Sequence, residues 1–98
     1  MRFMLTMTIP PAGGNDAMKS GALMEAMGEL IKTRRVEQSW FTARGGDRTA
    51  HFLLQLEEVS DMPSILEPFW TLASAKIEFT PVMNWEELQS GVRKLLGK

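Results

Sequence analysis

Residues 35–57, RVEQSWFTARGGDRTAHFLLQLE, decide the fold of this chain because they hold two β-rich runs on either side of Gly45-Gly46. Glycine accepts the positive φ angles that a two-residue hairpin turn requires. The stretch therefore predicts an antiparallel hairpin in which Trp40 lies opposite His51. A four-residue loop gives the same pairs, whereas a three-residue loop would shift them by one residue and reverse the faces of one strand.

The two faces of this hairpin differ in character, because successive side chains of a strand point to opposite sides. One face is apolar and is expected to join the core; it carries Phe41, Ala43, Ala50, Phe52, Leu54 and Leu56. The other face is mixed and carries Val36, Gln38, Trp40, Thr42, Thr49, His51, Leu53 and Gln55. A tryptophan and the chain's only histidine share this mixed face, which makes it the first place to look for a site.

Before the hairpin, the pattern predicts one strand and one helix. Residues 2–9 alternate between apolar and polar side chains, as a half-buried strand does. The pairs Pro10-Pro11 and Gly13-Gly14 predict a loop. Residues 17–33 follow with helical spacing of Leu23, Met27 and Leu30.

After the hairpin, the pattern predicts a helix, a strand and a last helix. Residues 62–73 form the first of these helices, with a kink or break expected at Pro68. Residues 75–83 alternate again and predict a strand, in which Pro81 indicates either an edge position or an interruption of the pairing. Asn84 then caps a C-terminal helix, with Glu87 at the capping-box position. The apolar stripe of that helix must dock on its own subunit or on a partner.

Composition excludes several classes of function. The 98 residues make one domain, 1–98, and the net charge of −1 without a basic run argues against binding nucleic acid. No apolar run approaches the ~20 residues of a membrane span. The absence of cysteine excludes thiol chemistry and indicates a reducing compartment, so we expect a cytoplasmic protein. With one histidine and no cysteine, we expect neither a metal site nor a cofactor.

The element order β-α-β-β-α-β predicts an α+β protein of the ferredoxin-like type, with an antiparallel sheet of strand order 4-1-3-2. Both connecting helices would then cover one face of the sheet. The other face has no helix, although it carries Met4, Val36, Trp40 and Leu53. Exposed apolar area of this kind usually marks a partner, and we expect a homodimer through the helix-free face.

The length, the strand order and the C-terminal helix resemble the dimeric α+β barrel superfamily, and the stretches MRFMLTMTIP, FTARGGDRT, EPFW and TPVM resemble its small bacterial members in particular. That superfamily includes muconolactone isomerases, cofactor-free antibiotic-biosynthesis monooxygenases and YCII-related proteins, and the closest resemblance is to small bacterial members without an assigned function. The resemblance implies two ferredoxin-like sheets that face each other to form a barrel. No catalytic motif of these families is matched residue by residue, and one fold hosts many chemistries.

The candidate site follows from this placement. His51 is the one side chain that ordinarily titrates near neutrality, and it would face the barrel interior. As a catalytic residue it would act as a general base, with Trp40 as an aromatic wall and Thr6, Gln38 and Glu78 as polar anchors for a ligand. Two other interpretations stay open, a non-catalytic ligand contact and a structural histidine paired with Thr or Gln at the dimer interface.

Two functions from different classes are therefore expected. The first is a small-molecule-binding module whose pocket lies inside a dimeric barrel and takes a small aromatic or lactone-like ligand. The second is a cofactor-independent enzyme, isomerase-like or monooxygenase-like, in which His51 abstracts a proton from an acidic C–H group.

Overall fold

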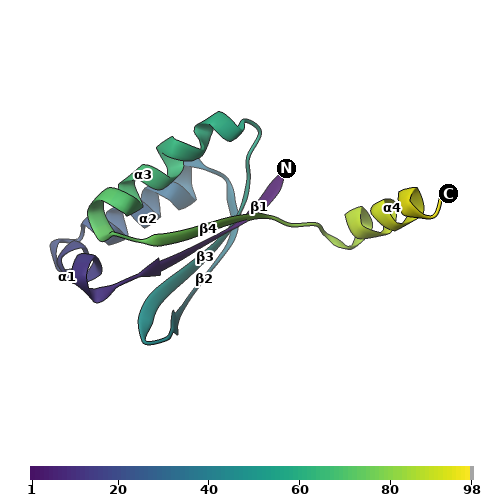
Figure 1. Cartoon of the computed structure of the whole chain (residues 1–98). Helices are drawn as coiled ribbons and strands as arrows, with labels where there is room; N and C mark the ends of the chain where they lie inside the picture. The colour runs from purple at the N-terminus through teal and green to yellow at the C-terminus, as the bar shows by residue number, and fades with distance from the viewer. Residues whose placement is uncertain (98) are drawn as a thin grey trace.

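The computed structural model describes residues 1–97, which form a small α+β fold (Figure 1). Its elements in chain order are β1 (Arg2–Ile9), α1 (Pro11–Ser20), α2 (Ala22–Thr33), β2 (Val36–Arg44), β3 (Asp47–Gln55), a short 3-10 turn (Val59–Asp61), α3 (Met62–Ala73), β4 (Lys76–Pro81) and α4 (Trp85–Leu95). The four strands make one antiparallel sheet of order β2-β3-β1-β4, which is β4-β1-β3-β2 when it is read from the opposite edge.

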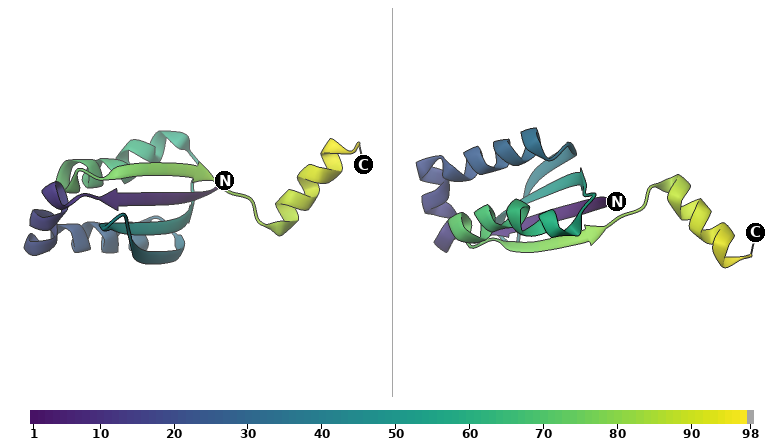
Figure 2. Two further views of the ribbon diagram at one scale, coloured as in Figure 1. Left: turned by 60° about the horizontal axis from the view of Figure 1, so that its bottom comes forward. Right: turned by 90° about the horizontal axis from the view of Figure 1, so that it is seen from above.

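The helices α1, α2 and α3 form a layer on one face of the sheet, and α4 lies apart from it (Figures 1 and 2). The opposite face of the sheet has no helix over it. Among residues 1–97, no helix combines the length and the apolar character needed to cross a lipid bilayer.

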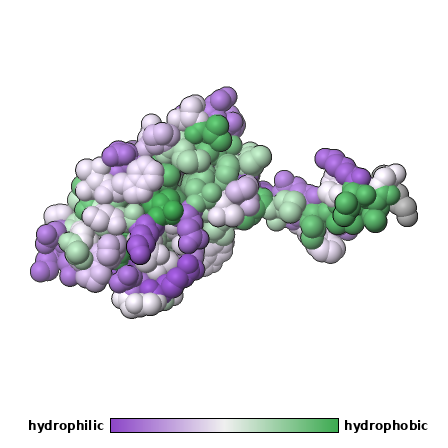
Figure 3. All heavy atoms as spheres, in the orientation of Figure 1, coloured by the Kyte–Doolittle hydropathy of each residue, from purple (hydrophilic) through white to green (hydrophobic). Residues whose placement is uncertain are grey.

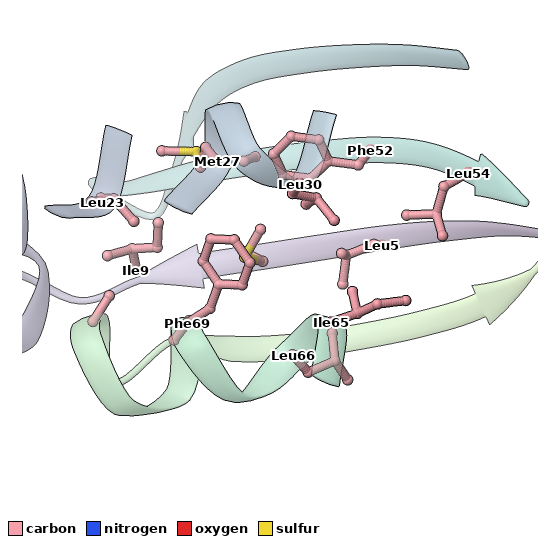
Figure 4. Packing of buried hydrophobic residues seen from close by; sticks show 14 of the residues in the cluster. Leu5, Ile9, Leu23, Met27, Leu30, Phe52, Leu54, Ile65, Leu66 and Phe69 are labelled. Carbon is pink, nitrogen blue, oxygen red and sulfur yellow. The ribbon is translucent and has the colours of Figure 1, made fainter. Parts of the chain in front are cut away.

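The core fills the space between the helix layer and the sheet (Figure 4). Strands β1 and β3 contribute alternate side chains, and Leu5, Phe52 and Leu54 are completely buried. From the helix side, Leu23 and Phe69 meet them. The alternation predicted from the sequence thus sets which face of the sheet is the core face, and the residues between these core positions lie on the helix-free face.

The N-terminal half of the helix layer differs from the sequence-based prediction. The segment 10–14 was expected to be a loop, but α1 already begins at Pro11, where proline suits a first helical turn. The single helix expected over 17–33 is two helices, because Gly21 adopts φ 84° and ends α1. A Cβ on Gly13 would lie 2.5 Å from the carbonyl oxygen of Ala73, so α1 packs closely on α3 through a glycine.

The hairpin has the predicted register, with Gly45 and Gly46 at positive φ and Trp40 opposite His51. The prediction for Val36 was wrong, because the pairing shifts between Val36 and Gln38. This bulge adds one residue to β2 and turns Val36 to the core face, where it packs against the hydrophobic cluster. The helix-free face therefore lacks one of its four expected apolar side chains.

The C-terminal half follows the predicted elements closely. Helix α3 has the predicted bounds, and it continues through Pro68 rather than breaking there. The capping box of α4 is present, with the Asn84 side chain accepting from the Glu87 backbone N–H at 2.8 Å. Docking of α4 on its own subunit is not found, because none of the residues Trp85–Leu95 is buried.

Candidate functional site

Four of the five predicted site residues form one row across the sheet. Trp40 on β2 is the register partner of His51 on β3, His51 is the partner of Thr6 on β1, and Thr6 is the partner of Glu78 on β4. Thr6, His51 and Glu78 belong to the helix-free face because their neighbours along each strand pack in or against the core, and Trp40 shares this face as the register partner of His51. The sheet thus brings an aromatic ring, an imidazole, a hydroxyl and a carboxylate into one line.

The imidazole of His51 is held by a single side-chain contact. Thr6 Oγ1 lies 3.0 Å from His51 Nδ1, and the Thr6 residue is only 8% exposed. Either the hydroxyl donates to Nδ1, or Nδ1–H donates to the hydroxyl oxygen. In the first case Nε2 carries the proton and is a donor. In the second case Nε2 has a free lone pair and is an acceptor or a base.

The indole of Trp40 lies beside His51 at the outer strand of the sheet. Trp40 is 47% exposed. Tryptophan usually buries a large apolar area against neighbouring side chains, so this exposure is unusual. Nothing in its own chain covers this half of the ring. The indole therefore offers a flat apolar wall next to the imidazole.

Gln38, the fifth predicted residue, lies one row away from the other four. Its register partner is Leu53, which in turn is the partner of Met4 on β1, and Met4 is opposite Thr80 on β4. Gln38 is exposed on the same face as His51. It can reach a ligand that lies over both rows, but it does not contact the Thr6–His51 pair.

Glu78 and His51 lie on strands that flank β1 on opposite sides. Two strand spacings separate these strands by about 10 Å, so the carboxylate and the imidazole are too far apart for a direct hydrogen bond between short side chains. A small molecule or a chain of water molecules lying on Thr6 can span the interval.

The sequence analysis missed a polar cluster at one end of the same face. Arg2 Nε lies 3.3 Å from Glu37 Oε2, and the Gln55 amide donates to Glu37 Oε1 at 2.8 Å. The hydrogen bond from Gln55, assisted by the positive charge of Arg2, lowers the pKa of Glu37 below its ordinary value of 4.5. The bulge that turns Val36 to the core face also brings Glu37 to the helix-free face. The sequence pattern does not predict this bulge.

The row lies outside the best-formed surface cavities of residues 1–97. Among residues 1–97, the five best-formed surface cavities are lined by other residues and not by Thr6, Gln38, Trp40, His51 or Glu78. In residues 1–97, no three His, Asp or Glu side chains gather closely enough to hold a metal ion. A site over His51 therefore needs a second surface laid across the helix-free face.

Comparison with curated proteins gives no match for this chain. A family model does match, and it covers residues 1–96, which is nearly the whole sequence. The chain therefore belongs to the family described as Domain of unknown function (DUF3303).

Proposed function

We propose that two copies of the chain bring their helix-free faces together and that the protein binds a small aromatic or lactone-like molecule between them. In this proposal each chain is a ferredoxin-like unit, and the two sheets form a dimeric α+β barrel. The strand neighbours β2-β3, β3-β1 and β1-β4 and the layer of helices on one face support it. The sequence resemblance to that superfamily supports it independently.

The observation that carries the proposal is the row Trp40–His51–Thr6–Glu78 on a face without helices. Ligand sites combine apolar or aromatic walls with a few placed polar groups, and this row supplies both kinds of group. The imidazole is already oriented by Thr6, so little side-chain entropy is lost when a ligand binds. The indole of Trp40 would stack on an aromatic or planar ring.

The need for a second copy follows from the exposure of apolar side chains on this face. Trp40 is exposed, and Met4 and Leu53 are only half-buried in the single chain. A second copy related by a two-fold axis presents the same residues, so the contact is self-complementary. Covering the face in this way would also remove water from around the imidazole row.

A second candidate function, catalysis without a cofactor, is favoured by the Thr6–His51 hydrogen bond. If Nδ1–H donates to Thr6 Oγ1, the lone pair of Nε2 faces the proposed pocket and can accept a proton. The substrate would be a compound with an acidic C–H group, such as a lactone, whose C–H group next to the carbonyl is acidic. Glu78 and Gln38 would then anchor its polar groups, without forming a nucleophile or a metal site.

The test is a set of thermal melts of the wild type with salicylate, catechol and γ-valerolactone as probes. A ligand at ten times its dissociation constant stabilises the folded state by about 1.4 kcal/mol. For a domain of this size that corresponds to a rise in Tm of roughly 6–11 °C. The variant His51→Ala should lose this rise, while Thr42→Ala, an exposed residue on the same face in the next row, should keep it.

Turnover of an active probe separates the two candidate functions. Binding without turnover supports the binding module. Turnover that falls by a factor of ~10²–10⁴ in His51→Ala, with unchanged far-UV circular dichroism, supports the general base. If His51→Ala melts at a lower temperature than the wild type and no probe shifts either protein, His51 has a structural role and the pocket proposal is refuted.

A further inference from the structure

Helix α4 extends from the body of the molecule as an arm, which all three ribbon views show (Figures 1 and 2). The arm makes the molecule 54 Å long, against 28 and 19 Å in the other two directions. Apolar side chains form a continuous patch along it (Figure 3). The exposed apolar side chains of α4 include Trp85, Leu88, Val92 and Leu95, which are 66%, 42%, 42% and 82% exposed.

The arm has the sequence of a helix that docks on a surface. Its four apolar residues recur at intervals of three and four, so they form one stripe of the helix. The N-terminus is fixed by the Asn84–Glu87 capping box, and Arg93 and Lys94 lie in the last turn. Even so, helices shorter than ~12–15 residues are marginal in water, and α4 has eleven residues. The helix therefore needs an apolar surface against its stripe.

The segment that joins β4 to α4 lies at the edge of the helix-free face. Arg2, which shares that face with Met4 and Thr6, extends Nη1 to Glu87 Oε1 at 3.2 Å. The backbone N–H of Val82 donates to the Arg2 carbonyl at 3.0 Å, so only two residues separate the last sheet contact from the helix. Arg2 thus holds the first turn of α4 beside the face that the proposed second copy would cover.

The area of the sheet face alone falls short of a stable dimer. Eight residues in β1 and four strands give a face of about 26 by 19 Å, or about 500 Å². A stable interface buries about 800 Å² on each partner. The eleven residues of α4 span about 16 Å and the helix is about 10 Å wide, so each docked arm covers about 160 Å². When each copy gives one arm and receives another, about 320 Å² is added per copy, and the total reaches about 800 Å².

We propose that α4 docks on a second copy of this chain, so that two copies exchange their arms and complete the dimer. This inference rests on the dimer of the proposed function and adds the arm to its interface. The apolar stripe of α4 faces the partner, and the polar side of the helix stays in solvent. The arm follows the end of β4 at the rim of the helix-free face, so it also closes one end of the space between the two sheets.

The experiment measures the dimer dissociation constant by sedimentation equilibrium for the full chain and three variants. Leu88→Glu/Val92→Glu places two carboxylates in the apolar stripe. Ser90→Glu is the matched control, because residue 90 lies between them on the opposite side of the helix. Leu53→Glu alters the helix-free face instead of the arm. In parallel, the emission of Trp85, obtained as the difference between the wild type and Trp85→Phe, is followed on dilution.

The proposal expects the double variant to dissociate at least tenfold more readily than the wild type, and Ser90→Glu to behave as the wild type does. It also expects the Trp85 emission to shift to the red as dilution separates the dimer. The arm exchange would be overturned if the wild type and the double variant had equal dissociation constants while Leu53→Glu was dissociated. That result would still support a dimer formed by the two sheets. A Trp85 emission that does not change as the dimer dissociates would also overturn the arm exchange, since the arm would then dock on its own chain. A wild type that is monomeric at micromolar concentration would overturn both proposals.

Discussion

Replacing Trp40 by alanine should weaken the proposed dimer strongly without a matching loss of monomer stability. The residue is 47% exposed in the single chain, and a tryptophan has up to about 250 Å² to bury, so about 120 Å² of indole is left for a partner. At about 25 cal/mol per Å², this area corresponds to about 3 kcal/mol per ring. Association recovers only part of such a value. If a third of it survives, the two rings of a dimer contribute about 2 kcal/mol, which is a factor of about 30 in the dissociation constant.

The chain supplies a matched control for this experiment. Trp70 on α3 is 45% exposed, nearly the same as Trp40, but it belongs to the helix layer on the opposite side of the sheet. Sedimentation equilibrium should therefore show a dimer about 30-fold weaker for Trp40→Ala and an unchanged dimer for Trp70→Ala. Equal effects of the two substitutions, or no effect of Trp40→Ala, would refute the placement of the interface on the helix-free face.

Three other predictions concern the fold and its polar contacts. Gly13→Ala should lower the free energy of unfolding by about 1–3 kcal/mol in urea titrations, because its Cβ would lie 2.5 Å from a backbone carbonyl oxygen of α3; an unchanged midpoint would argue against this packing. The pKa of Glu37 is lowered by the hydrogen bond from Gln55 and by Arg2, so its stabilising contribution is complete above pH 4.5 and is lost as the pH falls below that value. Melting curves from pH 7 to pH 3 should therefore fall less steeply for Glu37→Gln, and parallel curves would contradict this. Asn84→Ala should remove about 1 kcal/mol of helix capping and lower the helical circular dichroism; an unchanged spectrum would show that the cap is dispensable.

The sequence was sufficient for features that depend on local geometry. Gly45 and Gly46 both adopt positive φ, and that requirement fixed the hairpin register that puts Trp40 opposite His51. Strand alternation then assigned the core face and put Thr6, His51 and Glu78 on the opposite face, whereas the register that places Thr6 beside both His51 and Glu78 comes from the structure. The shared face could be predicted in this way because strand alternation has a period of two residues and the hairpin turn is known.

The features that the sequence did not predict depend on contacts between distant segments. A glycine pair near two prolines usually marks a loop, but Gly13 is required where α1 approaches the backbone of α3. The bulge beside Glu37 follows from pairing with β3 and has no local sequence signal, so Val36 was assigned to the wrong face. The apolar stripe of α4 was evident from the sequence, whereas its projection away from the body required the structure.

The most direct test of a ligand pocket between two helix-free faces is the NMR signal of the His51 ring. His51 is the only histidine, so its Cε1 proton gives one assignable resonance per chain. The measurement titrates salicylate, catechol and γ-valerolactone into the wild type and into Leu53→Glu at constant pH. If the proposed dimer holds the pocket, at least one probe should move the His51 resonance to saturation in the wild type and not in Leu53→Glu, which is designed to be monomeric. A resonance that no probe moves in the dimer, or that moves equally in both proteins, would contradict a pocket formed between two copies.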